Sequence, residues 1–249
     1  MEAKFLEGKA CLVTGGSRAL GASIVRSLVD NGADVALNYR EDAETANALC
    51  EELKHAGVRI EVIQADVTDQ AAVVRLISGV RKAFGKIDIL INNVGPYSDI
   101  PFLELSHEDF DHVMSANVRA TYLSMKIAGS HMKAQGSGHI INISATDAFH
   151  RSSSVYSLAK SGVIHLTQTL ALELAPEVRV NSIAPDLIAD NEGMTSELEK
   201  RAVQSTPIGR LVSRDEIAGV VSILCSPLFD IVTGQTIVLD GGRSISQRN

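Results

Sequence analysis

Tyr156 and Lys160 have residue types and a spacing suited to acid–base chemistry, and Tyr122 and Lys126 share both. Positions i and i+4 lie on one face of a helix, so the two side chains can meet there. A phenol has a pKa of about 10 and a general acid works best near ambient pH, so a useful shift is about three units. An ammonium about 4 Å away, at an effective dielectric constant of about 20, supplies an interaction of that size. Such a pair could protonate a carbonyl oxygen while a bound cofactor delivers hydride to the carbon.

A glycine-rich turn at residues 14–21 follows the first apolar run and precedes a helical pattern. At such a junction, backbone N–H groups and the positive end of the helix dipole point toward an anion, usually a phosphate. A triphosphate loop is excluded because Ala22 and Ser23 stand where lysine and serine or threonine are required. The GxGxxG pattern is also absent, since Ser17 occupies its third position. The turn therefore predicts a phosphate site of another kind.

The apolar pattern indicates the fold that must position these residues. Short, nearly continuous apolar runs alternate with longer amphipathic stretches. This predicts an α/β fold, a doubly wound and mostly parallel sheet with helices on both faces, as in the Rossmann fold. The predicted strands are 9–14, 33–38, 58–64, 87–92, 139–144, 179–183 and 236–239. The predicted helices are 20–31, 43–55, 69–84, 106–132, 155–174 and 213–224, and a glycine follows each of the first three.

Residues 1–249 are predicted to form one domain, because no repeat, low-complexity stretch or linker divides them. Segment 185–210 lacks a clear element between a strand and a helix. Irregular segments of that length are usually active-site lids or mobile loops, so we interpret this one as a lid.

Composition excludes several classes of protein. The chain has 23 basic and 30 acidic residues, a net charge of −7, which argues against nucleic acid as the main partner. Its three cysteines are far apart and suggest neither a disulfide framework nor a zinc site. No export signal and no membrane-spanning run are found, so we expect a cytoplasmic protein without membrane partners.

Several motifs occur in the order typical of the short-chain dehydrogenase/reductase family, and they span nearly the whole chain. The turn 14–21 resembles TGxxxGxG, with Ala19 at the position of the middle glycine. Residues 92–95 resemble NNAG, and residues 156–160 match YxxxK. The remaining matches are Asp66 and Val67, Asn117, 181–185, Thr233 and Gly234, and 240–242. Tyr122 and Lys126 also have the YxxxK spacing but precede the serine-bearing strand, so we assign them to packing or an oligomer surface.

The resemblance implies roles for individual residues. The catalytic set would be Tyr156 as general acid/base, Lys160 holding the nicotinamide ribose, Ser144 orienting the substrate oxygen and Asn117 holding a water that relays protons. The cofactor-binding set would be Thr14, Gly15, Ser17, Arg18, Leu20, Gly21, Tyr39, Arg40, Asp66, Val67, Asn93, Gly95, Tyr156, Lys160, Pro185 and Ile188. No metal is expected, because the seven histidines form no HExxH motif or cluster with cysteine.

The sequence departs from this family at three positions near the expected site. Counted along the strand, the position of the family's catalytic serine is occupied by Ala145, and Ser144 precedes that position by one residue. Adjacent strand residues point to opposite faces, so either the chain bends to bring Ser144 in, or Thr146 supplies the hydroxyl, or none is present. Asp186 replaces the glycine after the proline, and Asp190 stands where a threonine is common.

The residues after the second strand bear on which nicotinamide binds. Tyr39 stands where an acidic residue would bind the ribose 2′-hydroxyl and repel a 2′-phosphate. Arg18 and Arg40 could form the positive pocket that a 2′-phosphate needs, so NADP(H) is favoured over NAD(H).

The resemblance implies an NADPH-dependent reductase that converts a small-molecule carbonyl, of ketone or 3-oxoacyl type, to an alcohol. Members that act as 3-oxoacyl-acyl-carrier-protein reductases are the most similar functional type, and a homo-oligomer, tetramer or dimer, is expected. The alternative is a nucleotide-binding protein with little or no turnover, a sensor or scaffold, which Ala145, Asp186 and Asp190 motivate.

Overall fold

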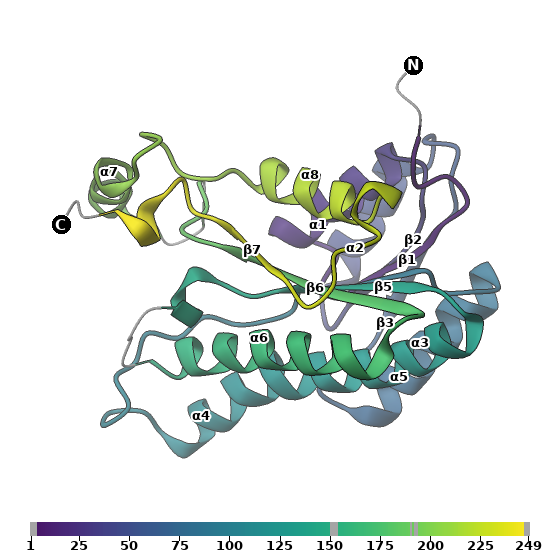
Figure 1. The fold of residues 1–249 in the computed structure, drawn as a ribbon, viewed down its shortest axis with the longest axis horizontal. Helices are drawn as coiled ribbons and strands as arrows, with labels where there is room; N and C mark the ends of the chain where they lie inside the picture. The colour runs from purple at the N-terminus through teal and green to yellow at the C-terminus, as the bar shows by residue number, and fades with distance from the viewer. Residues whose placement is uncertain (1–3, 150–153, 190, 192–193, 247–249) are drawn as a thin grey trace.

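The sheet is the centre of the computed structural model, which describes residues 4–149, 154–189, 191 and 194–246 (Figure 1). Seven strands pair in parallel in the order β3-β2-β1-β4-β5-β6-β7. The strands are β1 (Ala10–Val13), β2 (Asp34–Tyr39), β3 (Ile60–Gln64), β4 (Ile89–Asn92), β5 (Gly138–Ile143), β6 (Val178–Pro185) and β7 (Thr236–Leu239). The α/β prediction is confirmed, and all seven apolar runs contain a strand.

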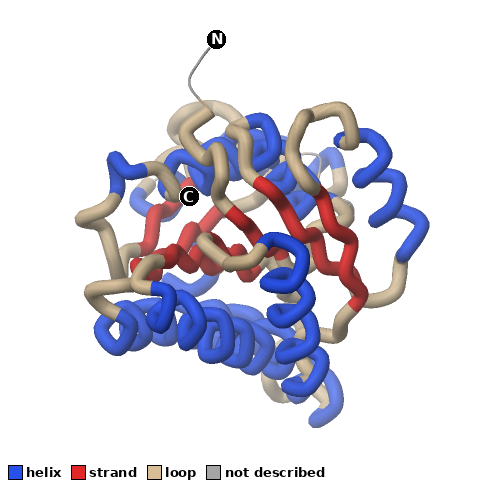
Figure 2. Tube along the Cα trace, turned by 90° about the vertical axis from the view of Figure 1, so that its right-hand side faces the viewer, coloured by secondary structure: helices blue, strands red, loops and turns tan. Residues whose placement is uncertain are grey.

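Helices cover both faces of the sheet (Figure 2). One face packs against α1 (Ala19–Asp30), α2 (Ala43–Leu53) and α8 (Arg214–Leu224), and the other packs against α3 (Gln70–Phe84), α5 (Ala120–Gln135) and α6 (Val155–Leu174). Strand β1 shows why its residues are all apolar: Cys11 and Val13 join the first core, whereas Ala10 and Leu12 join the second. Side chains alternate along a strand, so a strand with both faces covered must be apolar throughout.

Helix ends follow the predicted glycine signals. Gly32, Gly57 and Gly85 have φ values of +92°, +79° and +83°. This left-handed conformation costs glycine little because it has no Cβ. At the other end of α3, the Asp69 carboxylate accepts from the backbone N–H groups of Ala71 and Ala72.

The helix predicted at 106–132 is interrupted. The structure has α4 (His107–Met114), a π-helical turn over Ser115–Arg119 and then α5. Apolar periodicity cannot reveal such a turn, because it changes the backbone hydrogen bonds without ending the helix. Single π turns of this kind occur often at functional sites.

The prediction that 185–210 lacks a regular element is wrong over Ser196–Ser205, which forms helix α7. The Thr195 side chain caps it by accepting from the N–H of Leu198. Short 3₁₀ turns lie at Thr146–Phe149, Pro227–Phe229 and Arg243–Ile245. Within the described ranges, no helix combines the length and apolar character that crossing a membrane requires.

Acid should destabilise the fold through His139, a buried residue of β5. Its Nε2 lies 3.2 Å from Asn181 Nδ2 on β6, and burial, followed by the charge of Arg179, holds its pKa well below the usual value. The unfolded imidazole takes up a proton below about pH 6.5, whereas the folded one does not, so the free energy of unfolding should fall as pH drops. We expect a slope of up to about 1.4 kcal/mol per pH unit in urea unfolding between pH 7 and 5.

The control variant is His107→Gln, which removes an exposed histidine on α4. His139→Gln should lose that component of the slope, while His107→Gln should keep it. Equal slopes in both variants would show that His139 is not responsible.

Candidate active site

A cavity of about 880 Å³ opens at the carboxyl ends of the strands. It lies where the strand order reverses, between β1 and β4, which is the usual ligand position in doubly wound sheets. The predicted residues that line it are Gly15, Ser17, Arg18, Leu20, Gly21, Tyr39, Arg40, Asp66, Val67, Asn93, Gly95, Ser144, Tyr156, Lys160, Pro185 and Ile188. Thr14 and Asn117 are not among the lining residues.

The glycine turn is shaped for close approach to a ligand. Gly15 has φ +60°, and a Cβ on Gly21 would collide with the Gly15 carbonyl oxygen. Ala19, at the position of the middle glycine, has φ +47°. This left-handed conformation strains a residue with a side chain, by about 1 kcal/mol.

Buried side chains hold the turn in place from neighbouring strands. Asn93, after β4, donates from Nδ2 to the carbonyl oxygens of Thr14 and Gly15, at 3.2 and 3.1 Å. Its backbone N–H donates to Thr14 Oγ1 at 3.0 Å. Asn38 Oδ1, at the end of β2, accepts from the Gly15 N–H. Thr14 is 2% exposed and supports the turn from beneath, and its contact with a cofactor stays a prediction.

Tyr156 and Lys160 meet at the start of α6, as their spacing predicts. Ser154 caps this helix by accepting from the Ser157 N–H. Lys160 Nζ lies 5.3 Å from the centre of the Tyr156 ring and donates to the Ile143 carbonyl oxygen at 2.9 Å. Lys160 is only 2% exposed, so its position is well defined by the strand end and the ring.

The charge balance of this pair differs from the prediction. Burial lowers the pKa of Lys160 to about 8, and the nearby Asp147 carboxylate opposes this. Burial also raises the pKa of Tyr156, with further contributions from Asp147 and Tyr97. The expected lowering of the phenol pKa by the ammonium is therefore not found in this structure, because the cost of burying a phenolate dominates.

Hydrogen bonds fix the directions of the two hydroxyls on either side of Ala145, those of Ser144 and Thr146. Ser144 is 1% exposed and its Oγ donates to the Lys160 carbonyl oxygen at 3.0 Å, which directs the hydroxyl proton toward α6. Thr146 Oγ1 donates instead to Asp186 Oδ1 at 2.8 Å. Ala145, which has no hydroxyl, lines the cavity. Ser144 lines the cavity, but its hydroxyl donates to the helix rather than into the cavity, and its role in orienting a substrate stays a prediction.

Asn117 lies in the π-helical turn, behind the cavity wall. Its Nδ2 donates to the carbonyl oxygens of Pro96 and Val113, at 3.1 and 3.0 Å. Its Oδ1 is buried without a hydrogen-bond partner in the structure. A Cβ added at Gly95 would collide with this oxygen and would lie 2.8 Å from Lys160 Nζ. An orphaned acceptor beside an ammonium is a place where a polar ligand or water fits.

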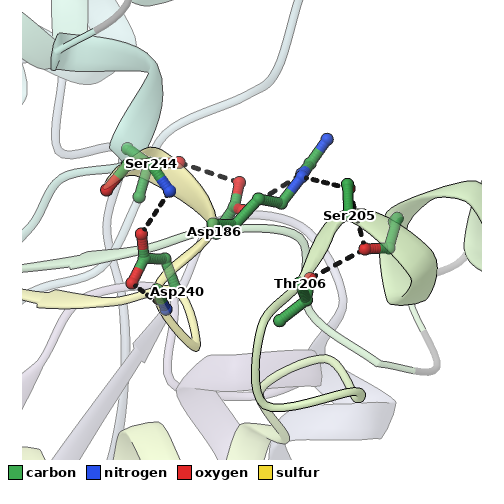
Figure 3. Close-up of polar contacts among 9 residues, drawn as sticks. Asp186, Ser205, Thr206, Asp240 and Ser244 are labelled. Carbon is green, nitrogen blue, oxygen red and sulfur yellow. Dashed lines mark hydrogen bonds and ion pairs between the residues drawn. The ribbon is translucent and has the colours of Figure 1, made fainter. Parts of the chain in front are cut away.

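Asp186 connects the cavity to α7 (Figure 3). Besides the bond from Thr146, its Oδ2 accepts from Arg243 Nη1 at 3.0 Å, and Arg243 Nε donates to Ser205 Oγ at 3.1 Å. The turn that carries Arg243 is held by Asp240, which accepts from backbone N–H groups that include that of Ser244 (Figure 3). The departure at Asp186 therefore links the ends of β5 and β6 to the last residue of α7. Asp190 lies outside the described residues.

The far end of the cavity carries mixed charge. Arg18 and Arg40 line it, and Arg40 pairs with Glu41 at 2.8 Å. Asp42 caps α2 by accepting from the Thr45 N–H and Oγ1. The two exposed guanidinium groups are therefore the cationic groups that could face a ligand phosphate here.

Sequence reasoning missed several residues of the cavity wall, among them three polar ones. Tyr97, Asp147 and Asn38 line it, yet none belongs to a motif used above. A signal existed for Asn38, an isolated polar residue in an apolar strand. Nothing local marks the other two, because loops place them.

The residues fit a dinucleotide. Gly21 and Gly95 line the cavity at points where the backbone leaves no room for a Cβ. Arg18 and Arg40 lie at one end of the cavity. The Tyr156–Lys160 pair lies at the other end, with the unpartnered Asn117 Oδ1 behind the wall. These are the parts that phosphates, a ribose and a polar ring amide require.

Known proteins are similar to this chain in sequence and in fold. A family model described as Enoyl-(Acyl carrier protein) reductase matches residues 15–244. The 3-oxoacyl-acyl-carrier-protein reductase of Staphylococcus aureus is 35% identical over 239 residues, covering 94% of this chain and 97% of that protein. A short-chain dehydrogenase/reductase structure from Serratia marcescens has a TM-score of 0.90 and 34% identity, with 96% of this chain and 99% of that chain covered.

A 7α-hydroxysteroid dehydrogenase, solved in complex with NADH and 7-oxo glycochenodeoxycholic acid, has a TM-score of 0.91 and 29% identity, with 96% of this chain and 95% of that chain covered. The chain belongs to the short-chain dehydrogenase/reductase family of oxidoreductases.

Proposed function

We propose that the chain binds NADP(H) in the cavity and reduces a ketone-type carbonyl to an alcohol, with Tyr156 as the proton donor. The observation that carries the proposal is the Tyr156–Lys160 pair in the wall of a cavity that begins at the glycine turn. The 3-oxoacyl reductase and the steroid dehydrogenase among the relatives support it.

When bound, the reduced nicotinamide supplies hydride to the carbonyl carbon. Tyr156 supplies the proton to the oxygen, and its phenol is protonated at neutral pH, as an acid must be. Lys160 remains mostly an ammonium below about pH 8, where it stabilises the phenolate left behind. Asn117 Oδ1 can accept from a water that replaces the proton. Backbone N–H groups of the glycine turn hold the phosphates.

The substrate end favours a neutral substrate. Asp99 and Asp147 line it, and carboxylates repel an anionic group. We therefore expect ketones and β-ketoesters to be better substrates than the matching β-keto acids.

A substrate panel tests the proposed function. Purified protein and NADPH are mixed with ketones, β-ketoesters, β-keto acids and quinones, and the loss of NADPH absorbance is followed. Turnover of a ketone or β-ketoester, absent in Tyr156→Phe, is the expected result. Tight NADPH binding with no turnover across the panel would favour the sensor or scaffold alternative.

NADPH should bind more tightly than NADH because of Arg18 and Arg40. Tyr39 at the end of β2 brings no charge against a 2′-phosphate, and Asp42 is bound to the start of α2. Arg40 would exchange Glu41 for the phosphate, at small cost because this exposed pair is weak. Each charge-assisted contact contributes about 1.5–3 kcal/mol, so Arg18→Gln and Arg40→Gln should each weaken NADPH binding about tenfold or more.

Calorimetric titration provides the measurement, with Arg75→Gln on α3 as the matched control outside the cavity. The dissociation constant for NADH should change little in all three variants. Equal constants for NADPH and NADH in the parent protein would refute the preference.

We propose further that the chain forms a homo-oligomer, a dimer or tetramer. Apolar side chains are exposed on α5 and α6 and near β7, the edge strand, namely Tyr122, Leu158, Leu172, Leu228, Ile231 and Val238. Light scattering after size exclusion would test this, and a monomer would contradict it. The cytoplasmic location stays a prediction.

A further inference from the structure

Ala145 stands where the family resemblance places the catalytic serine, so the cavity wall beside Tyr156 has no hydroxyl at this position. A serine there would donate a hydrogen bond to the substrate oxygen as negative charge develops on it. Ala145 cannot, and the neighbouring hydroxyls of Ser144 and Thr146 donate to the Lys160 carbonyl and to Asp186. The proposed reduction therefore needs a donor from another element.

Tyr97 is placed to be that donor. It follows β4, lines the cavity, and its ring packs edge-on against that of Tyr156, with 5.0 Å between centroids and 68° between planes. Direct contact of the rings means that the two phenols share one wall. Tyr97 is 65% exposed, so its hydroxyl can turn toward a substrate without breaking a packed core.

Other hydroxyls among the described lining residues are in the wrong place. Ser17 follows β1, Tyr39 is the last residue of β2 and Thr68 follows β3, so all three lie at the nucleotide end of the cavity. Thr68 Oγ1 also donates to Asp66. Within the part of the chain that the structure describes, Tyr97 is thus the remaining hydroxyl next to Tyr156.

We propose that Tyr97 is a second catalytic tyrosine, whose Oη donates a hydrogen bond to the substrate carbonyl oxygen in place of the missing serine. The inference rests on the proposed function. As hydride adds to carbon, the carbonyl π electrons move to oxygen, and that oxygen takes the proton of Tyr156. Tyr97 keeps its own proton and stabilises the developing charge. Burial, Asp99 and Asp147 raise the pKa of Tyr97, which keeps it a neutral donor.

The test uses Tyr97→Phe with the best ketone or β-ketoester of the panel. Removing an enclosed donor of this type costs about 10²–10³-fold in kcat, and the exposure of Tyr97 reduces the expected loss to about 30-fold. The KM and the dissociation constant for NADPH should change less than about threefold, because the bond strengthens mainly in the transition state. Tyr122→Phe on α5 is the matched control and should be fully active.

Rescue separates a catalytic role from a structural one. Ala145→Ser in the Tyr97→Phe background should recover at least about tenfold in kcat, because a serine hydroxyl returns to the same wall. Circular dichroism and thermal unfolding should be unchanged, since Tyr97 is mostly exposed. If Tyr97 had only a structural role, a serine hydroxyl at position 145 would not restore kcat.

The outcomes distinguish this inference from the proposed function. If Tyr156→Phe is inactive and Tyr97→Phe is fully active, Tyr97 has no catalytic role while the reductase proposal stands. Loss of activity without rescue, accompanied by a higher KM, would also overturn the role. Absence of turnover in the parent protein would remove both proposals.

Discussion

Tyr156→Phe should lower kcat for carbonyl reduction by about 10³-fold, the largest effect we expect from a single substitution. The phenol is the proposed source of the proton, and phenylalanine keeps the ring that packs against Tyr97 and lies beside Lys160. Cofactor affinity and the unfolding midpoint should therefore stay close to those of the parent protein. Steady-state kinetics, NADPH titration and thermal unfolding measure the three quantities separately.

Tyr122→Phe supplies the comparison. Tyr122 has the same spacing to a lysine, and Lys126 Nζ lies 5.7 Å from its ring centre, but it lies on α5 outside the cavity. Full activity of this variant with near-complete loss in Tyr156→Phe is expected. Activity of Tyr156→Phe within about tenfold of the parent would mean that another group donates the proton.

Gly95→Ala should lower kcat/KM by about 10²-fold or more, the second largest effect. The added Cβ would collide with Asn117 Oδ1 and lie 2.8 Å from Lys160 Nζ. Neither neighbour can move freely, because Asn117 is 0% exposed and held by two bonds, and Lys160 donates to Ile143. Displacing the Lys160 ammonium disturbs both the acid and the proposed ribose contact. Overpacking at such a site costs about 1–3 kcal/mol.

Gly219→Ala is the matched control for this substitution. Gly219 lies within α8, and a Cβ there would meet nothing within 4 Å. This variant should keep full activity and gain up to about 1 kcal/mol of stability, since alanine favours the helix. NADPH titration and kinetics on both variants give the comparison. Kinetics like those of the parent protein in Gly95→Ala would show that the positions of Asn117 and Lys160 behind Gly95 do not matter for the reaction.

The elements of the fold were predictable because each depends on neighbours in the chain. Strand β1 reads as a continuous apolar run since both its faces are covered, and α3 is delimited by Asp69 and Gly85. The glycine turn and the Tyr156–Lys160 spacing are also local patterns. Helix α7 was missed because most of its residues are polar and it buries only Ala202. The π turn was missed because it leaves the apolar period almost unchanged.

The candidate site could be predicted only in part. Residues at strand ends, such as Gly15, Arg40 and Asn93, could be assigned to the cavity, since the carboxyl ends of parallel strands meet at one edge. The direction of the Ser144 hydroxyl, in contrast, depends on the Lys160 carbonyl of another element. The contact of Tyr97 with Tyr156 and the link from Asp186 to Arg243 join residues 59 and 57 positions apart.

The sequence by itself determined the succession of strands along the chain, the family, the glycine turn after β1, and the tyrosine and lysine that share one face of α6. Those features follow from short-range periodicity and from residue types at fixed spacings. Only the tertiary structure decided which hydroxyls face the cavity and which way burial moves the pKa of Tyr156. The reason is physical: hydrogen-bond partners and desolvation are supplied by segments that are distant in the chain, and no local pattern specifies them.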